Sequence, residues 1–238
     1  MKLHHNSPSH SHQSAIDTLT GLSDLPLLSK ALEEVFVGRA CVVSAFGAES
    51  ALVLDLVARV DRHTPILFID TGKHFRETLD YRDLLIDRFR LTDVRSIGPA
   101  TDRTIGDPTG DLHKSDTDAC CDIRKVRPLD QALSQFDCWV TGRKRFQGGS
   151  RTLLPTAEAD GPNRVKLNPL ADWTPDQIDG YFENYALPRH PLWLNGYRSI
   201  GCGPCTSAPR PGEDARAGRW AGLGKTECGI HRYGGQAA

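Results

Sequence analysis

The sequence predicts an α/β fold in which a central, mostly parallel sheet is flanked by helices. Apolar runs at Ala40–Phe46 and Pro65–Asp70 read as buried strands, and Asp93–Ile97 reads as a third. Segments with helical periodicity lie between them, an alternation that is typical of parallel sheets covered on both faces. A chain of 238 residues with 39% hydrophobic residues is long and apolar enough to bury the core of such a fold.

The helices are predicted from apolar residues repeated at three- and four-residue intervals. Such stripes lie at Leu28–Phe36, Val53–Val60, Tyr81–Phe89 and Asp118–Ala132. Pro128 should end or kink the last of these helices. A further strand is expected at Cys138–Thr141, followed by a basic loop over Gly142–Arg151. The capping box Thr174-Pro-Asp-Gln177, with proline in the first helical position, predicts the start of a final helix.

The composition divides the chain into three parts. Residues 1–18 are polar and rich in His and Ser, which predicts a disordered tail. Residues 19–210 hold the expected strands and helices and should form one domain, with a flexible loop over Gly98–Thr117. Residues 211–238 are rich in Gly and Arg, which favours a mobile C-terminal segment.

Charge and hydropathy exclude several classes of partner. The formal net charge is −1, so no bulk positive field favours nucleic acid or an anionic membrane. No apolar run is long enough to span a bilayer, and the N-terminus lacks the apolar core of a secretory signal. Seven cysteines in a chain of this size fit a reducing cytoplasm better than a disulfide framework.

Two turns directly follow predicted strands, where parallel α/β sheets bind their ligands. The first, Ser44-Ala-Phe-Gly47-Ala-Glu-Ser50, consists mostly of small residues and leads into a helix N-terminus, an arrangement that suits an anion. The second is Asp70-Thr71-Gly72. Each alone could be an ordinary tight turn, but their shared position at strand ends favours a ligand site.

Four cysteines form two pairs that lie far apart in the sequence, Cys120-Cys121 and Cys202-Gly-Pro-Cys205. Four thiolates suit an iron–sulfur cluster or a zinc ion, and the second pair could also be a thioredoxin-like dithiol. A disulfide between the adjacent cysteines would be strained. Lys125 follows Cys121 by four residues, so on a helix its ammonium lies over the same face as that thiol.

Three further groups suit the binding and attack of an anionic substrate. Arg216 and Arg219 would share a helical face, and guanidinium groups bind sulfate or phosphate in a bidentate manner, although each could also be a solvated surface residue. Lys144 and Arg145 of the basic loop could join them. Cys228 lies in Glu-Cys-Gly-Ile-His, where nearby cations would lower the thiol pKa and make the cysteine a nucleophile.

Together these motifs resemble those of the assimilatory adenylyl-sulfate and phosphoadenylyl-sulfate reductases. The resemblance runs from about Ala40 to His231. Its most specific parts are Cys-Cys with Arg124-Lys125, Tyr197-Arg-Ser-Ile-Gly-Cys-Gly-Pro-Cys-Thr, Gly-Glu-Asp-Ala-Arg-Ala-Gly-Arg-Trp and Glu-Cys-Gly-Ile-His. It implies an adenine nucleotide alpha-hydrolase-like (PP-loop) fold, although the first turn lacks the paired glycines of related pyrophosphatases.

The resemblance also implies a role for each candidate residue. One 4Fe–4S cluster would be bound by Cys120, Cys121, Cys202 and Cys205, and Cys228 would be the nucleophile. The phosphosulfate would be surrounded by Lys125, Arg216, Arg219 and His231, with Lys144 and Arg145 nearby. Of these residues, Arg216, Arg219 and His231 would neutralise its charge. The nucleotide pocket would be lined by Ser44, Gly47, Asp70, Thr71 and Gly72. Residues 19–210 would form the sulfonucleotide-binding domain with the cluster, and residues 211–238 would carry Cys228.

The implied reaction is the reduction of adenosine 5'-phosphosulfate to sulfite and AMP through a cysteine S-sulfonate, with thioredoxin or glutaredoxin as the dithiol donor. The presence of both cysteine pairs resembles the cluster-containing bacterial type, which prefers this substrate; some members also accept 3'-phosphoadenylyl sulfate. A cytoplasmic homo-oligomer without a nucleic acid or membrane partner is expected.

Two other classes of protein stay open at this point. A nucleotide-activating enzyme of the pyrophosphatase-loop group, such as a tRNA thiolase, would carry a basic RNA-binding face, and the near-neutral charge and poor loop match argue against it. A non-catalytic zinc-binding or cluster-sensing protein would leave Cys228 and the paired arginines unexplained.

Overall fold

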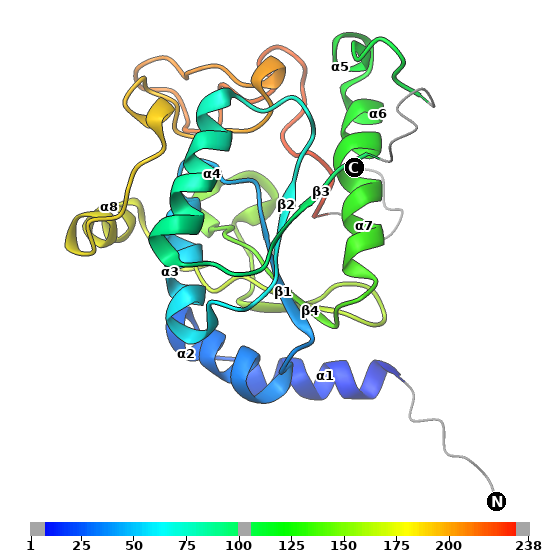
Figure 1. The fold of residues 1–238 in the computed structure, drawn as a ribbon, viewed down its shortest axis with the longest axis vertical. Coiled ribbons are helices and arrows are strands. Elements are labelled where there is room, and N and C mark those ends of the chain that lie inside the picture. Colours follow the sequence, from blue (N-terminus) through cyan, green and yellow to red (C-terminus); the bar gives the residue numbers. More distant parts are fainter. Residues whose placement is uncertain (1–7, 100–105, 232–238) are drawn as a thin grey trace, which may run out of the picture.

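A computed structural model describes residues 8–99 and 106–231 (Figure 1). Within this part, one sheet contains six strands in the order β3-β2-β1-β4-β6-β5. The parallel strands are β1 (Ala40–Ser44), β2 (Ile66–Ile69), β3 (Val94–Ile97), β4 (Cys138–Val140) and β6 (Val165–Leu167). β5 (Ala157–Ala159) pairs antiparallel with β6. The predicted α/β fold with a mostly parallel sheet is confirmed.

The strand order reverses beside β1, and this reversal positions the site. Val42 of β1 lies opposite Ile66 of β2 on one side and opposite Val140 of β4 on the other. The chain continues from β1 outward to β2 and β3, and later returns to place β4 on the opposite side of β1. Connections therefore leave the carboxyl ends of β1 and β4 in opposite directions, which opens a crevice between them.

The helices on one face of the sheet are α2 (Asp24–Lys30), a π-helical turn over Ala31–Val35, α3 (Ser50–Asp61) and α4 (Arg76–Phe89), with α8 (Pro175–Asn184) outside α3 (Figure 1). Their apolar sides pack on the sheet in one core that includes Leu28, Leu52 and Phe68. The predicted capping box starts α8, where Thr174 accepts a hydrogen bond from the Gln177 N–H. In residues 8–99 and 106–231, no helix is both long and apolar enough to cross a bilayer.

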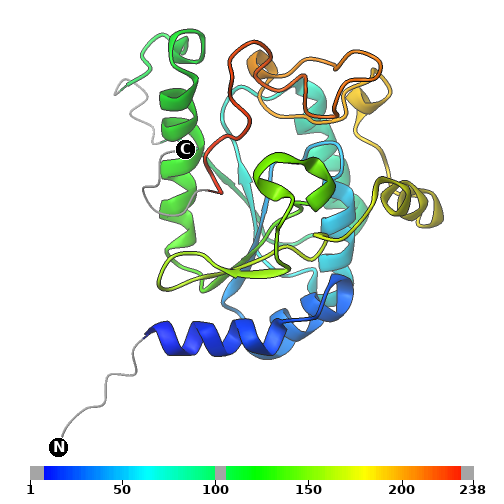
Figure 2. The same ribbon diagram turned by 180° about the vertical axis from the view of Figure 1, so that it is seen from behind.

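The other face is covered by one long rod made of α6 (Thr117–Cys121), a π-helical turn (Asp122–Val126) and α7 (Arg127–Leu133) (Figure 2). Leu129 and Leu133 pack against Trp139 in a second core. Pro128 was predicted to end or kink this helix, and it does not end it. Pro128 lies in the first turn of α7, which follows the π-helical turn in which the Arg127 N–H bonds the Asp122 carbonyl five residues back.

Two segments that were predicted to be irregular contain helix. α5 (Leu112–Ser115) lies in the expected loop over Gly98–Thr117, of which residues 100–105 are outside the described part. The prediction of a disordered tail is wrong from Pro8 onward, because α1 (Pro8–Leu19) is a helix. Its Leu19 is fully buried, and Ile16 packs partly buried against the same core. Apolar residues near the end of α1 anchor it, despite the polar composition that precedes them.

Substitution of Leu19 by alanine tests the docking of α1. We expect Leu19→Ala to lower the free energy of unfolding by about 2–5 kcal/mol, because a fully buried leucine leaves a cavity when it is truncated. Urea titration followed by circular dichroism measures the change. The control Leu25→Ala removes the same atoms from a side chain that is 36% exposed, and should cost less than about 1 kcal/mol. Equal losses in the two variants would contradict the docking of α1.

Candidate active site

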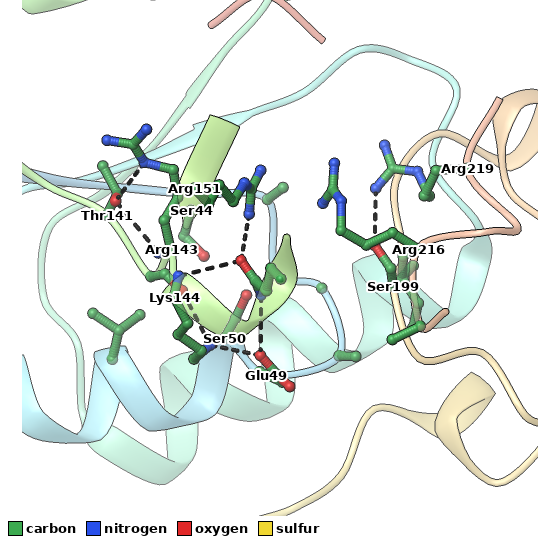
Figure 3. Close-up of a pocket in the computed structure, with 18 of the residues that line it drawn as sticks. Ser44, Glu49, Ser50, Thr141, Arg143, Lys144, Arg151, Ser199, Arg216 and Arg219 are labelled. Atoms are coloured by element: carbon green, nitrogen blue, oxygen red, sulfur yellow. Dashed lines mark hydrogen bonds and ion pairs between the residues drawn. The ribbon is translucent and has the colours of Figure 1, made fainter. Parts of the chain in front are cut away.

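Two neighbouring cavities lie at the carboxyl ends of β1 and β4. The first, of about 240 Å³, is enclosed by the Ser44–Ser50 turn, the basic loop after β4 and the chain around Ser199 to Arg219 (Figure 3). The second, of about 150 Å³, is lined by Lys125, Cys202 and Cys228 among others. Both cavities are also lined by Arg151, Arg216, Arg219 and His231. The shared residues make the two cavities parts of one site.

The turn after β1 is held in a strained shape by its own residues. Phe46 has a positive φ of 48°, which is rare for a bulky residue, and its ring is fully buried edge-on against Phe68. The Phe46 N–H donates to the Ser44 hydroxyl oxygen at 3.1 Å. A β-carbon on Gly47 would lie 3.1 Å from the Ile200 carbonyl oxygen, so glycine allows the chain around Ile200 to approach. Ser44 and Gly47 both line the first cavity, and their contact with a nucleotide stays a prediction.

Only one of the two predicted cations in the basic loop reaches this site. Lys144 lines the first cavity and is buried, and its Nζ donates to Glu49 Oε2 at 2.6 Å (Figure 3). Arg145 lines neither cavity. Its Nε donates to the Leu154 carbonyl oxygen at 2.7 Å, and its guanidinium pairs with Asp172. The short 3₁₀ helix Arg145–Gln147 turns successive side chains to different sides, which explains the difference.

Sequence reasoning did not single out three arginines that line the first cavity, Arg143, Arg151 and Arg198. Arg143 is buried, pairs with Glu158 and donates to Asn168 Oδ1 at 3.1 Å. Arg151 ends a second 3₁₀ helix, Gly149–Arg151, and is also buried. Arg143 and Arg151 belong to the basic loop from which Lys144 and Arg145 were chosen. The cluster of basic residues in this loop indicated an anion site, but the sequence does not reveal which of their side chains face the cavity.

Arg216 and Arg219 meet at the site without sharing a helix. The chain from Pro211 to Trp220 forms turns, in which the Arg219 N–H bonds the Arg216 carbonyl at 2.8 Å. Arg216 Nη2 donates to the Thr226 carbonyl at 2.7 Å. The Nε of Arg219 is buried and has no hydrogen-bond partner. The expected helical face is wrong, since Gly and Pro interrupt the segment, but the expected convergence of the two arginines occurs.

Glycine at position 201 makes room for Arg219. A β-carbon there would lie 2.3 Å from Arg219 Nη2 and 2.5 Å from its Cζ. The guanidinium therefore occupies the space directly above the Gly201 backbone. This contact holds it between the two cavities.

His231 contributes a neutral ring. Its imidazole stacks on the Trp139 indole, with centroids 5.6 Å apart and an interplanar angle of 4°. Burial, together with the charges of Arg143 and Arg151, holds the pKa of His231 well below its ordinary value. Its Nδ1 is buried without a hydrogen-bond partner. The neutral ring can offer hydrogen bonds, and the part of His231 in neutralising a sulfate stays a prediction.

The residues of the turn after β2 line two different cavities. Thr71 lines the second cavity, and its hydroxyl lies 3.3 Å from Cys202 Sγ. Asp70 and Gly72 instead line a separate cavity of about 470 Å³, beside Arg124. Asp70 Oδ1 accepts a hydrogen bond from the Gly72 N–H at 2.9 Å, which shapes the turn. Of the three residues of this turn that were expected to line the nucleotide pocket, the structure brings only Thr71 to the site.

The two cysteine pairs interact electrostatically. Cys120 and Cys121 end α6, and Cys202 precedes the 3₁₀ helix Gly203–Cys205. Burial raises the pKa of Cys120, Cys121 and Cys205, and the charge of Cys202 acts in the same direction on all three. In the chain from Pro8 to Pro99 and from Gly106 to His231, no three His, Cys, Asp or Glu side chains form a group that could hold a metal ion.

Lys125 lies among these sulfurs, as its spacing from Cys121 predicted. It is buried and lines the second cavity. Burial opposes its charge, but the nearby Cys202, Cys228 and Cys121 raise its pKa above the ordinary value. For the Cys202 thiol, burial acts in the opposite direction and would raise the pKa. The charge of Lys125 and the hydrogen bond with Thr71 outweigh burial and bring the pKa of Cys202 below its ordinary value. The lysine is thus a fixed positive charge beside the thiols.

Cys228 lines the second cavity as a half-buried thiol. The preceding residue, Glu227, forms a bidentate ion pair with Arg151 at 2.7 and 2.9 Å. Burial disfavours the charged carboxylate, but the hydrogen bonds and charge of Arg151 hold the pKa of Glu227 below its usual range. The site therefore combines a thiol that a ligand can reach with arginines and a lysine that attract anions.

A parallel α/β sheet with a basic crevice at the carboxyl ends of its strands defines a class of proteins that bind nucleotides or other anions. Residues 39–208 match the family model described as the phosphoadenosine phosphosulfate reductase domain. The match covers most of the chain, and the chain belongs to this family.

Similar curated proteins carry related names. A protein of Mesorhizobium japonicum named adenosine 5'-phosphosulfate reductase is 50% identical over 92% of this chain and 87% of its own length. One of Deinococcus radiodurans with the same name is 43% identical over 79% of this chain and 74% of its own length. A phosphoadenosine 5'-phosphosulfate reductase of Gloeobacter violaceus is 39% identical over 82% of this chain and 83% of its own length.

Among solved structures, the phosphoadenylyl-sulfate reductase of Candida auris matches with a TM-score of 0.67. It is 24% identical, and the match covers 87% of this chain and 99% of that one. The FMN adenylyltransferase of Candida glabrata matches with a TM-score of 0.53 at 16% identity, over 85% of this chain and 66% of that one. At these identities the likeness concerns the fold, and it agrees with the nucleotide-binding fold expected from the sequence.

Proposed function

We propose that this chain reduces adenosine 5'-phosphosulfate to sulfite and AMP in assimilatory sulfate reduction. Membership of the reductase family and the names of its relatives support the reaction class. The observation that carries the proposal is the position of Cys228. Its half-buried thiol faces a cavity that contains Lys125 and shares Arg216 and Arg219 with the cavity beside the Ser44–Ser50 turn.

The substrate would lie across both cavities. Its adenosine and phosphate would occupy the first cavity, which is lined by Ser44 at the end of β1 and by Gly47 in the turn that leads to α3. Its sulfate would then extend into the second cavity toward Cys228. Arg216 and Arg219 line both cavities, so they lie where the phosphate and sulfate would meet.

The first step would be an attack by the Cys228 thiolate on the sulfur of the substrate. A bond forms between the two sulfur atoms, the bond from sulfur to the phosphate oxygen breaks, and AMP leaves with that electron pair. An anionic thiolate and an anionic sulfate repel each other. Arg216, Arg219 and Lys125 reduce this repulsion by charges already in place, and neutral His231 can donate a hydrogen bond.

The second step would use the two thiols of thioredoxin or glutaredoxin. One partner thiolate attacks the Cys228 sulfur, and sulfite leaves with the electron pair of the sulfur–sulfur bond. The second partner thiolate then attacks the resulting mixed disulfide and regenerates Cys228. The dithiol is oxidised to a disulfide, so the two electrons that produce sulfite come from the partner protein.

A 4Fe–4S cluster would be held by Cys120, Cys121, Cys202 and Cys205, as the family resemblance implies. The chemistry of the donor set fits, because two remote segments supply four thiols and the charge of Cys202 acts on the other three. When bound, such a cluster would supply negative charge and join the two segments. Cys120 and Cys121 would hold the cluster from the end of α6, and Cys202 and Cys205 would hold it from the second segment. A zinc ion is the alternative that the same thiols allow.

We propose further that the enzyme works in the cytoplasm. All seven cysteines are free thiols, which supports a reducing compartment such as the cytoplasm. We propose adenosine 5'-phosphosulfate as the preferred substrate, with 3'-phosphoadenylyl sulfate as a second one, since similar proteins carry either name. We also propose that the enzyme acts as a homo-oligomer and that residues 211–231 form a mobile segment that carries Cys228; residues 232–238 of the predicted segment lie outside the described part.

Replacement of Cys228 by serine tests the nucleophile. Cys228→Ser should fold, bind AMP like the wild type and lose sulfite formation by at least about a thousandfold, because a hydroxyl is a poor nucleophile at neutral pH. A sulfite assay with reduced thioredoxin measures the loss, and calorimetry with AMP is the control for an intact pocket. Wild-type enzyme incubated with substrate, without a donor, should show a sulfonate adduct on the Cys228 peptide by mass spectrometry. Residual turnover close to wild type, or no adduct, would overturn the mechanism.

Replacement of Cys121 by alanine tests the cluster. Anaerobically purified wild type should contain about four iron atoms per chain and absorb in the visible range. Cys121→Ala should lose the iron, the colour and most activity. The control Cys41→Ala makes the same change at a buried thiol in β1 and should keep its iron. Metal analysis that finds zinc in place of iron, or a Cys121→Ala variant that keeps its iron, would reject the cluster.

Replacement of Gly201 by alanine tests the position of Arg219. The new methyl group would displace the guanidinium that now lies 2.3 Å from that position. We expect KM for adenosine 5'-phosphosulfate to rise about tenfold through loss of a charge-assisted contact, with unchanged folding. Gly180→Ala is the matched control, because nothing lies within 4 Å of a β-carbon there. Steady-state kinetics with a normal KM for Gly201→Ala would show that Arg219 does not bind substrate from this place.

A further inference from the structure

Glu227 is a carboxylate within a basic site. Its two oxygens accept hydrogen bonds from Nε and Nη2 of Arg151 at 2.7 and 2.9 Å. Arg216 Nη2 lies 3.4 Å from Glu227 Oε2, and the positive charge of Arg143 also acts on this carboxylate. Bidentate pairs of this kind are among the strongest that a carboxylate makes, and they match those that arginine makes with phosphate.

The partners of Glu227 are also residues of the candidate substrate site. Arg151 and Arg216 line both cavities, while Glu227 itself lines the second. The remaining guanidinium nitrogen of Arg151, Nη1, donates to Gln147. Every nitrogen of Arg151 therefore already has a partner, and an incoming anion can bind the face used by Glu227 only by taking its place.

The same ion pair fixes the segment that carries the nucleophile. Glu227 directly precedes Cys228, and Arg216 also binds the carbonyl of Thr226. Lys225 attaches the segment on its other side, by donating to the Thr117 carbonyl at 3.1 Å. Arg151 and Arg216 line both cavities, so their contacts with this segment can be reached by a bound anion, whereas Lys225 lines neither cavity. Breaking the contacts of Glu227 would release the chain next to the reactive sulfur.

We propose that Glu227 is an internal anion that occupies Arg151 and Arg216 until the anionic group of the substrate displaces it. Resting on the function proposed above, this makes Glu227 a positioning residue that acts through the two arginines. Before substrate arrives, it prevents repulsion among buried cations and holds Cys228 against the basic loop. Substrate binding exchanges one anion for another and frees the Thr226–Cys228 chain for the dithiol partner. If Glu227 were only a static support, its removal would weaken the binding of anions.

Glu227→Gln separates the two roles, because it keeps the shape and removes the competing charge. We expect the Kd for AMP, measured by calorimetry, to fall about five- to tenfold. The variant without ligand should melt at a lower temperature than the wild type, and inorganic sulfate should raise its melting temperature more than that of the wild type. Glu213→Gln is the control: it makes the same change at an exposed residue of the same segment, whose carboxylate accepts only the Arg210 N–H, and should match the wild type in each measurement.

An AMP Kd that is equal to or higher than that of the wild type, or a sulfate response no larger, would overturn the proposal. If Glu227→Gln does not fold, Glu227→Asp replaces it: a carboxylate shortened by one carbon cannot keep both bonds to Arg151, so AMP should again bind more tightly than in the wild type. Failure of AMP to bind to any variant would instead reject the nucleotide site of the proposed function. In that case the sulfate response alone would decide the role of Glu227.

Discussion

Neutralisation of buried cations is the constraint on which the carboxyl edge of the sheet depends. Arg143, Lys144 and Arg151 are all buried there, and each is paired with a glutamate from a different segment. Charges that are taken out of water need such partners, since an unpaired one costs several kcal/mol by order of magnitude. Glu49 after β1, Glu158 in β5 and Glu227 near the C-terminus thus join the turn, the sheet edge and the nucleophile segment around one basic loop.

Glu158 and Glu227 differ in whether a ligand could replace them as partners of the arginines. Glu158 also interacts with Asn168 and Lys166, inside a network whose partners lie in β6 and the residue after it, so it is a structural member of the sheet. Glu227 belongs instead to a segment of turns with few buried residues, and its carboxylate lines a cavity. The first arrangement is stable because every member has a partner within the fold. The second can exchange partners, which is what a site that must accept an anion requires.

Hydrophobic periodicity predicted the parts of the fold that bury the most apolar surface. The strands β1, β2 and β4 were predicted correctly because every residue in them is buried, which gives each a short apolar run. β5 and β6 were missed because three-residue strands carry too little pattern, and Lys166 in the middle of β6 looks polar although a buried ion-pair network surrounds it. The helix α1 was missed for a related reason: a few apolar residues such as Leu19 decide its docking, and composition averages them away.

Residue type alone was enough to select candidate site residues with reactive or charged side chains. It could not predict which side chains of the basic loop point into the cavity. Cys228, Lys125 and Arg219 were selected because thiols, amines and guanidinium groups cluster for few reasons, and all three line the second cavity. Whether Arg145 or Arg151 faces the cavity depends on the rotation of two 3₁₀ turns, which no spacing rule reveals. The neutral ring of His231 has the same origin, since its pKa follows from burial and the arginines around it. Because the pKa of His231 lies well below its ordinary value, the ring stays neutral in the pH range where histidine usually titrates, and the attraction for an anion comes from Lys125 and the arginines.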